Sequence, residues 1–142
     1  GVEGVLILDY PVEEAEPLRA PLVVAGLDPI FLISPTTSDE RIRQSSELGA
    51  GFLYAISRLG VTGVRDQLAP DAATLVQRVK AQTTLPVALG FGISTPGHVA
   101  AACAHADAAV VGSAIVNVIA DNRRNGAPDA VREYVRWLKS GL

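Results

Sequence analysis

The stretch Leu89-Gly90-Phe91-Gly92-Ile93-Ser94-Thr95-Pro96 carries the pattern around which the rest of the chain is organised. It is an apolar run that stops at glycine and is followed at once by residues that start a helix. The stretch Val110-Val111-Gly112-Ser113-Ala114-Ile115-Val116 repeats this pattern. In a parallel α/β protein, both stretches place free backbone N–H groups and the positive end of a helix dipole at the carboxyl ends of strands. Two such strand ends side by side predict one site for a phosphate.

Short apolar segments bounded by glycine and proline predict five parallel strands. They cover residues 5–8, 30–33, 51–56, 86–89 and 108–111. The first of these is expected to be fully buried, because it is a continuous apolar run too short for a helix. Between the strands the sequence predicts helices over residues 11–25, 38–48, 70–83, from Thr95 onward, 114–120 and 128–138. In the first helix, Pro17 and Pro21 each remove a hydrogen bond, so we expect a kink or an early end.

This alternation of strands and helices is typical of successive βα units on a parallel sheet. Two architectures fit it: an open doubly wound sheet, or part of a (βα)₈ TIM barrel. A complete barrel needs about 250 residues, whereas this chain has 142. We therefore expect residues 1–142 to form a single unit, and any barrel to be an incomplete one of about five strands with outer helices.

The composition and the absence of certain motifs disfavour several kinds of partner and cofactor. The net charge of -3 gives no basic surface for nucleic acid, and no apolar run is long enough to span a membrane. Cys103 is the only cysteine, which excludes an intramolecular disulfide and disfavours a metal site, so we expect a cytoplasmic protein. The nucleotide-binding G-x-G-x-x-G and Walker patterns are both incomplete, and we predict no cofactor.

The phosphate site is predicted to use backbone N–H groups of Gly63, Gly92 and Ser113, with hydroxyls of Ser113 and Ser94. Glycine suits such positions because a Cβ would hold the backbone away from the phosphate oxygens. The segment 57–69 is long for a connection between a strand and a helix and is a candidate lid over this site. The alternative is that these glycines only make tight turns from strand to helix.

Residues suited to acid–base chemistry are few. Asp9 lies at the end of a strand, where it could act in catalysis or cap the next turn. His98 and His105 are seven residues apart on one helix and are expected to be surface residues rather than metal ligands. Tyr54 is expected to line the core or a pocket. No pair of carboxylates stands out as catalytic.

Five segments in order resemble the tryptophan synthase α chain. They are residues 1–14, 29–36, 54–63, 86–94 and 111–116. The motifs Ser-Arg-x-Gly-Val-Thr-Gly at 57–63 and Gly-Phe-Gly-Ile-Ser at 90–94 are the most specific, and the resemblance runs through essentially the whole chain. It implies a (βα)₈ barrel that cleaves indole-3-glycerol phosphate to indole and glyceraldehyde 3-phosphate. It also implies a partner, a PLP-dependent β chain that receives the indole.

The resemblance also assigns roles to individual positions. The substrate phosphate would be held by Gly63, Gly92, Gly112 and Ser113. The indole pocket would include Leu6, Leu8 and Ile33. Tyr54 would line the active site beside a catalytic carboxylate, and Thr62 would lie on the mobile loop that closes over the substrate.

The main departure from the family is a missing part. The family's catalytic glutamate and aspartate belong to its second strand and the following loop, whereas this chain resembles only the last five of eight βα units. We therefore expect the chain alone to be almost inactive, and a further segment or self-association to complete the sheet. Gly1 and the absence of methionine favour a fragment. The alternatives are another phosphate-binding barrel, either indole-3-glycerol phosphate synthase or a histidine-pathway isomerase, and a non-catalytic fragment that binds phosphate or a partner.

Overall fold

The computed structural model describes residues 1–8, 10–56, 70–90, 92–124 and 126–142. In these ranges five parallel strands form one sheet in the order β1-β2-β3-β4-β5. The strands are β1 (Gly4–Leu6), β2 (Asp28–Ile33), β3 (Leu53–Ile56), β4 (Val87–Gly90) and β5 (Ala108–Val110). Sequential order with parallel pairing is the arrangement of a barrel wall, not of a doubly wound sheet, whose strand order reverses.

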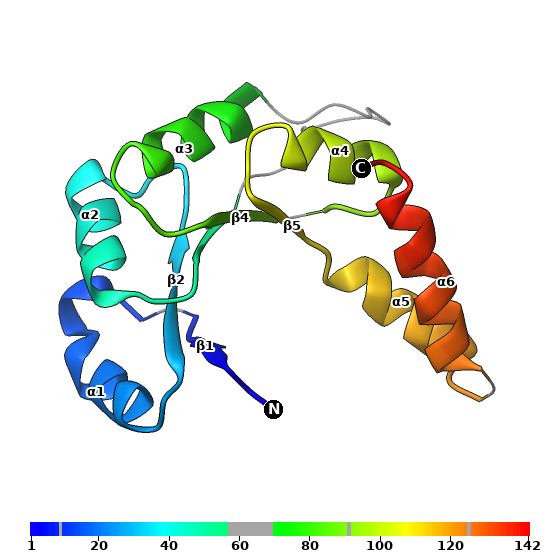
Figure 1. Cartoon of the computed structure of the whole chain (residues 1–142), viewed down its shortest axis with the longest axis horizontal. Helices are drawn as coiled ribbons and strands as arrows, with labels where there is room; N and C mark the ends of the chain where they lie inside the picture. The colour runs from blue at the N-terminus through cyan, green and yellow to red at the C-terminus, as the bar shows by residue number, and fades with distance from the viewer. Residues whose placement is uncertain (9, 57–69, 91, 125) are drawn as a thin grey trace.

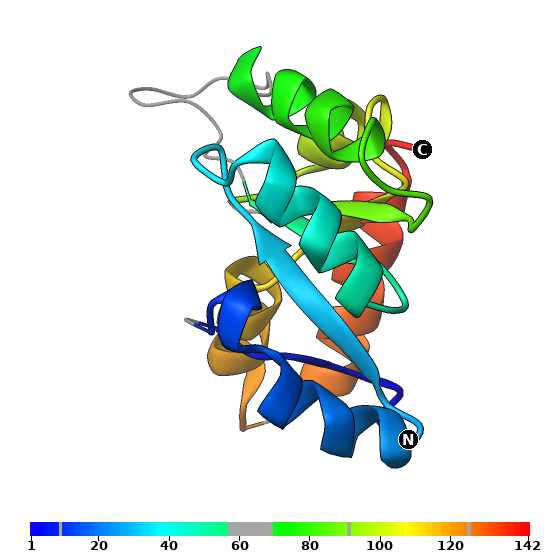
Figure 2. The same cartoon turned by 90° about the vertical axis from the view of Figure 1, so that its left-hand side faces the viewer.

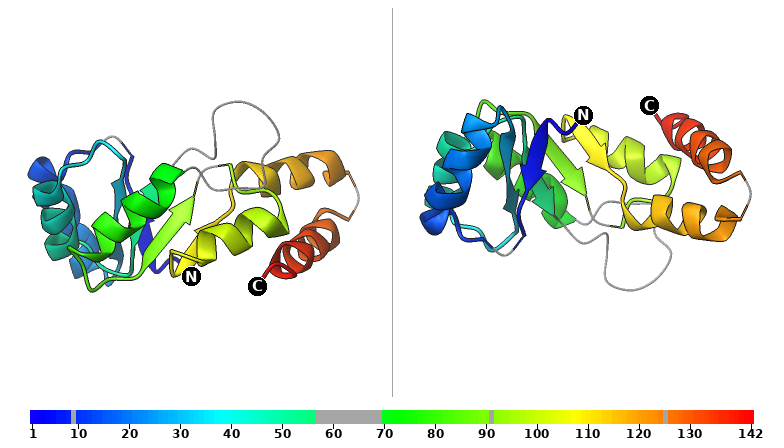
Figure 3. Two further views of the ribbon diagram at one scale, coloured as in Figure 1. Left: turned by 90° about the horizontal axis from the view of Figure 1, so that it is seen from above. Right: turned by 90° about the horizontal axis from the view of Figure 1, so that it is seen from below.

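The helices cover one side and one end of this curved sheet. They are the short 3₁₀ helix η1 (Val12–Glu14), α1 (Glu16–Val24), α2 (Asp39–Leu48), α3 (Pro70–Lys80), α4 (Pro96–Cys103), α5 (Ser113–Asn122) and α6 (Ala127–Lys139). Figure 1 shows α1 to α4 following the convex side, with the N-terminus on the concave side. Figure 2 shows α1 to α3 stacked in front of the strands. Helices α5 and α6 form a pair at the opposite end from α1 and α2 (Figure 3). The described part is a curled half-barrel.

Two helices begin with side-chain caps at residues where the sequence predicts a helix to start. The Ser38 hydroxyl accepts a hydrogen bond from the Arg41 N–H, 3.3 Å away, at the start of α2. The Thr95 hydroxyl accepts one from the His98 N–H, 3.2 Å away, at the start of α4. Each bond satisfies one N–H group that the first turn leaves without a backbone partner.

The predicted helix 11–25 is divided in two. Residues Val12–Glu14 form the 3₁₀ turn, and α1 begins only at Glu16. The reason is Pro17, because in one continuous helix its ring would clash with the carbonyl of Glu13 four residues earlier. Pro21 is accommodated inside α1, and the helix stops before Gly26, which adopts φ 72°. The other predicted strands and helices end within three residues of the observed bounds.

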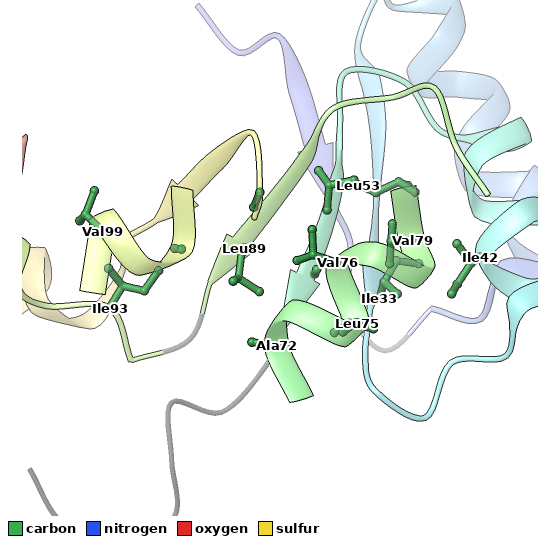
Figure 4. Close-up of a cluster of buried hydrophobic side chains, with 14 of the residues drawn as sticks. Ile33, Ile42, Leu53, Ala72, Leu75, Val76, Val79, Leu89, Ile93 and Val99 are labelled. Carbon is green, nitrogen blue, oxygen red and sulfur yellow. The ribbon is translucent and has the colours of Figure 1, made fainter. Parts of the chain in front are cut away.

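The buried core lies between the convex side of the sheet and the helices. It contains fully buried side chains from β2, β3, β4, α2 and α3 (Figure 4). The largest of them are Ile33, Ile42, Leu53, Leu75, Val76, Val79 and Val87. Leu138 of α6 joins the same cluster and is 4% exposed. This single apolar cluster joins all strands from β2 to β5 to the helices.

The register of the strands separates two rows of side chains. One row runs through Leu32, Tyr54, Ala88 and Ala108, and the next through Ile33, Ala55, Leu89 and Ala109. Successive side chains of a strand point to opposite faces, and the Ile33 row belongs to the helix-side core. The Leu32 row therefore faces the concave side. Leu6 pairs with Ile30, two residues before Leu32, and shares that concave face.

The expectation that residues 5–8 form a fully buried strand is wrong. Strand β1 ends at Leu6 and is only partly buried, while Ile7 is 37% and Leu8 is 62% exposed. The physical reason is position: β1 is at the edge of the sheet, and within the described ranges it pairs with β2 alone.

Among the helices that the structure describes, none combines the length and the apolar character needed to cross a bilayer.

The two faces of β2 give a matched pair of substitutions. Ile33→Ala empties a fully buried site and should lower the free energy of unfolding by about 2–5 kcal/mol, whereas Leu32→Ala, on the partly exposed concave face, should cost about half as much or less. Urea denaturation followed by circular dichroism measures both, with an unchanged m-value as the control. Equal losses from the two variants would contradict the assignment of faces.

Asp107 links β4 to α3 and predicts a sensitivity to acid. Its carboxylate accepts bonds from Lys80 Nζ at 2.9 Å and from the Val87 N–H at 2.8 Å, and these bonds lower its pKa from the ordinary 3.8. A lowered pKa means that this stabilisation is complete above the unfolded-state pKa and is lost as the pH falls through the folded-state pKa.

We expect Asp107→Asn to flatten the fall in unfolding free energy below about pH 4, by less than about 1 kcal/mol, because the ion pair is exposed. Urea titrations between pH 3 and 7 measure this. Lys80→Gln should produce part of the same flattening, since Lys80 makes the larger contribution to the pKa. An identical acid profile for wild type and Asp107→Asn would contradict the role of this carboxylate.

Candidate functional site

A pocket of about 370 Å³ lies at the carboxyl ends of β3, β4 and β5, and we call it the strand-end pocket. Its lining residues come from β3, from the segment after β4, and from β5 and the start of α5. They are Tyr54, Gly92, Ile93, Ser94, Val110, Gly112, Ser113, Ala114 and Asn117. Three strand ends thus contribute to one concavity.

The N-terminus of α5 forms one wall of the strand-end pocket. Gly112 is its N-cap, and the Gly112 carbonyl accepts hydrogen bonds from the N–H groups of Ile115 and Val116 at 2.9 and 3.2 Å. The N–H groups of Ser113 and Ala114 precede these, and helix geometry provides them with no acceptor within the helix. A Cβ built on Gly112 would meet no atom within 4 Å, so it would project into open space. This wall offers hydrogen-bond donors and the positive end of a helix dipole to an anion.

The opposite wall depends on one glycine at the end of β4 and another just after it. Gly92 has φ 76°, a left-handed conformation that favours glycine. At Gly90, a Cβ would lie 2.6 Å from Cε2 of Tyr54, so the absence of a side chain lets the Tyr54 ring pack over the strand. Burial raises the pKa of Tyr54 above its ordinary 10.0. The phenol therefore stays protonated near neutral pH and can donate a hydrogen bond.

Ser94, also on this wall, is held by side chains from two helices. Its carbonyl accepts a 2.7 Å bond from the Tyr134 hydroxyl of α6, and its N–H donates to Nδ1 of His98 in α4 at 3.3 Å. The Ser94 hydroxyl lies 3.5 Å from the same nitrogen. His98 is thus a half-buried hydrogen-bonding residue, not the surface residue expected from the sequence.

The structure brings together several of the residues that the sequence singles out. Tyr54, Gly92, Gly112 and Ser113 all line the strand-end pocket. Gly63 and Thr62 lie outside the described residues, as does Asp9. Sequence reasoning missed Asn117, although its position four residues after Ser113 places it on the same face of α5.

The three positions assigned to an indole pocket lie in different environments. Leu6 is on the concave face and Leu8 is exposed beyond the end of β1. Ile33 is 0% exposed and packs in the helix-side core (Figure 4), out of reach of a ligand on the concave side. Leu32, like Ile30, is a residue of β2 that shares the concave face with Leu6, and the alternation of side chains along the strand is the signal that identifies it.

A second pocket of about 400 Å³ lies between the ends of β1 and β2 and helix α2. Its lining includes Ile7, Leu32 and Arg41. The Arg41 guanidinium is engaged by Glu13, with Nε 2.7 Å from Oε1. Because that carboxylate already balances the charge of Arg41, this pocket is the poorer site for an anion.

Within the described ranges, no group of three or more His, Cys, Asp or Glu residues is arranged to hold a metal ion. Tyr54 is the one titratable side chain among the lining residues of the strand-end pocket. The described part of this pocket therefore offers binding donors and one phenol, but no carboxylate.

Known proteins similar to this chain agree on one family. A family model described as "Tryptophan synthase alpha chain" matches residues 1–140. A tryptophan synthase alpha chain of Methanoregula boonei is 47% identical over 144 residues, which cover 98% of this chain and 54% of that protein. One from Solibacter usitatus is 44% identical over 143 residues, covering 100% of this chain and 54% of that protein.

A solved structure of the Pyrococcus furiosus tryptophan synthase a2b2 complex is similar in fold, with TM-score 0.87 and 34% sequence identity. The likeness covers 99% of this chain and 56% of that chain. The chain therefore spans about half the length of the curated relatives that it matches.

Proposed function

The chain belongs to the tryptophan synthase alpha chain family, and from this premise we propose that it supplies the phosphate-binding part of a carbon–carbon lyase site. The substrate is indole-3-glycerol phosphate, the products are indole and glyceraldehyde 3-phosphate, and the step belongs to tryptophan biosynthesis. The observation that carries this proposal is the convergence of Gly92, Gly112 and Ser113 on one pocket.

The phosphate is held mainly by the start of α5. The N–H groups of Ser113 and Ala114 donate to its oxygens, the Ser113 hydroxyl adds a further bond, and the helix dipole favours the negative charge. Gly92 and Gly112 leave room for the anion to approach the backbone. By the family resemblance, Gly63 is a further phosphate-binding residue and Thr62 a supporting one; both lie outside the described residues.

The indole part of the substrate extends over the concave face. Tyr54 connects the phosphate site to this face, since it lines the strand-end pocket and belongs to the Leu32 row. Leu6, Leu8 and Leu32 supply an apolar wall beyond it. Ile33 is omitted because its side chain is on the other face of the sheet.

Bond cleavage requires groups from outside this chain. By the resemblance, the family's catalytic glutamate and aspartate belong to its first three βα units, and this chain corresponds to the last five. Leu8 is exposed, and β1 and β5 lie at the two edges of the sheet formed by the described residues; both features suit a sheet that is completed by those units or by a second copy of the chain. We propose the former, because the relatives are about twice as long.

The completed protein acts with a tryptophan synthase β chain in the cytoplasm. Support for the β chain comes from the Pyrococcus furiosus relative, which is a tryptophan synthase a2b2 complex. Support for the compartment comes from the free thiol of Cys103. No observation favours the two other phosphate-binding barrels or a non-catalytic role.

Phosphate binding tests the proposed site directly. Titration of ¹⁵N-labelled chain with inorganic phosphate and with glycerol 3-phosphate should shift the amide signals of Gly92, Gly112 and Ser113 in a saturable way. Ser113→Ala removes one hydrogen bond to a charged ligand and should weaken binding about tenfold.

Ser46→Ala is the matched control, because that hydroxyl bonds to Thr83 Oγ1 at 2.6 Å and is absent from the pocket lining. It should leave the affinity unchanged. Absence of saturable binding, or equal binding by wild type and Ser113→Ala, would overturn the site.

Indole release tests the proposal that this chain binds the phosphate while the first three βα units supply the groups that cleave the bond. The 142-residue chain alone should release no indole from indole-3-glycerol phosphate above background. Fusion to the first three βα units of the Methanoregula boonei relative should restore turnover, because it supplies the missing carboxylates and covers the concave face. Turnover by the chain alone at the rate of a full-length relative would refute the proposal.

A further inference from the structure

Ser94 is held on both sides by side chains from outside its own segment. The Tyr134 hydroxyl, 40 residues away in the sequence, donates to the Ser94 carbonyl at 2.7 Å. The Ser94 N–H donates to His98 Nδ1 at 3.3 Å. Both polar backbone groups of one pocket-lining residue are therefore engaged, and neither partner lines the pocket itself.

His98 connects this segment to the start of α4. Its backbone N–H donates to Thr95 Oγ1 at 3.2 Å while its ring accepts from Ser94. The pair of bonds resembles a capping box, in which the third helical residue reaches back to the residues before the helix. Here a histidine nitrogen takes the part that a Glu or Gln oxygen usually plays. It ties the end of the pocket wall to a helix N-terminus.

Tyr134 is placed by the packing of α6 rather than by local sequence. Leu138, one turn further on, is 4% exposed in the shared core, and Tyr134 packs against the same cluster. Beyond α6, a Cβ on Gly141 would lie 2.8 Å from the Pro96 carbonyl carbon, so glycine allows the chain to pass close to α4. Both views in Figures 1 and 2 place the C-terminus beside α4. This packing brings the phenol to the Ser94 carbonyl.

We propose that Tyr134 and His98 are positioning residues for the phosphate site, a role that rests on the proposed function. Together they hold the segment from Gly92 to Ser94 against the pocket. Without these two bonds the backbone dihedral angles of Gly92 would be weakly restrained, since glycine in a left-handed conformation has few steric restraints. With Ser94 anchored on both sides, the Gly92 N–H keeps one direction relative to the donors of α5. The C-terminal helix thereby affects ligand affinity without touching the ligand.

Three variants test this role. Tyr134→Phe keeps the ring and its contact with Trp137, whose centroid is 5.5 Å away, and removes only the hydroxyl. It should weaken the binding of inorganic phosphate about fivefold, the effect of one lost hydrogen bond. His98→Ala should weaken it similarly. His98→Gln should restore affinity to within about twofold, because the amide oxygen can accept from the Ser94 N–H.

Tyr10→Phe is the matched control, since Tyr10 lines the other pocket and should leave phosphate affinity unchanged. Urea denaturation of each variant separates positioning from stability. A purely structural role would lower the free energy of unfolding while leaving the affinity of the folded protein unchanged, and that result would overturn the proposal. If His98→Ala does not fold, the phosphate affinities of Tyr134→Phe and His98→Gln still test the positioning role.

The titration of wild type with phosphate distinguishes failure of the positioning role from failure of the proposed phosphate site. If wild type binds phosphate and Tyr134→Phe binds equally well, the positioning role is refuted and the phosphate site stands. If wild type shows no saturable binding, the phosphate site itself fails and the positioning role fails with it.

Discussion

The packing of one row of side chains against α2, α3 and α4 is the constraint on which the structure depends. Ile33, Ala55 and Leu89 lie side by side across three strands and are 0–3% exposed. Because a strand presents alternate residues to opposite faces, burying this row commits the neighbouring row to the concave side. The register of the strands therefore decides both which side chains are buried in the core and which can contact a ligand on the concave side. Tyr54 faces a pocket because Leu53 and Ala55 are in the core.

The strand-end pocket follows from the same constraint. Parallel strands bring their carboxyl ends to one edge, and the residues after β4 and β5 turn there into helices. Glycine is required at Gly92 by its left-handed backbone and at Gly90 by the Tyr54 ring. Helix α6 stabilises this edge from outside, through Leu138 in the core and the Tyr134 hydroxyl on Ser94. Fold stability and site geometry are therefore coupled through the last helix.

Prediction from sequence is most accurate for features that depend on interactions between residues close together in the chain. Caps at Ser38 and Thr95 depend on residues a few positions apart, and both helix starts are confirmed. The prediction of a fully buried strand at 5–8 is wrong, because burial depends on which elements cover a strand and not on its own composition. The resemblance assigns Ile33 to the indole pocket, whereas the structure buries it against the helices. The limit is similar, because the apolar residues at the end of a strand do not reveal which of them face the helices.

The sequence by itself determined the alternation of strands and helices, the glycine-rich strand ends, and the family to which the chain is similar. These are properties of short segments, each specified by a few neighbouring residues. Only the tertiary structure decided that Asn117 joins the pocket, that Ile33 leaves it, and that Tyr134 and His98 meet at Ser94. The physical reason is that these relations depend on register and on helix packing, which bring together residues far apart in the chain, such as Ser94 and Tyr134, 40 positions apart.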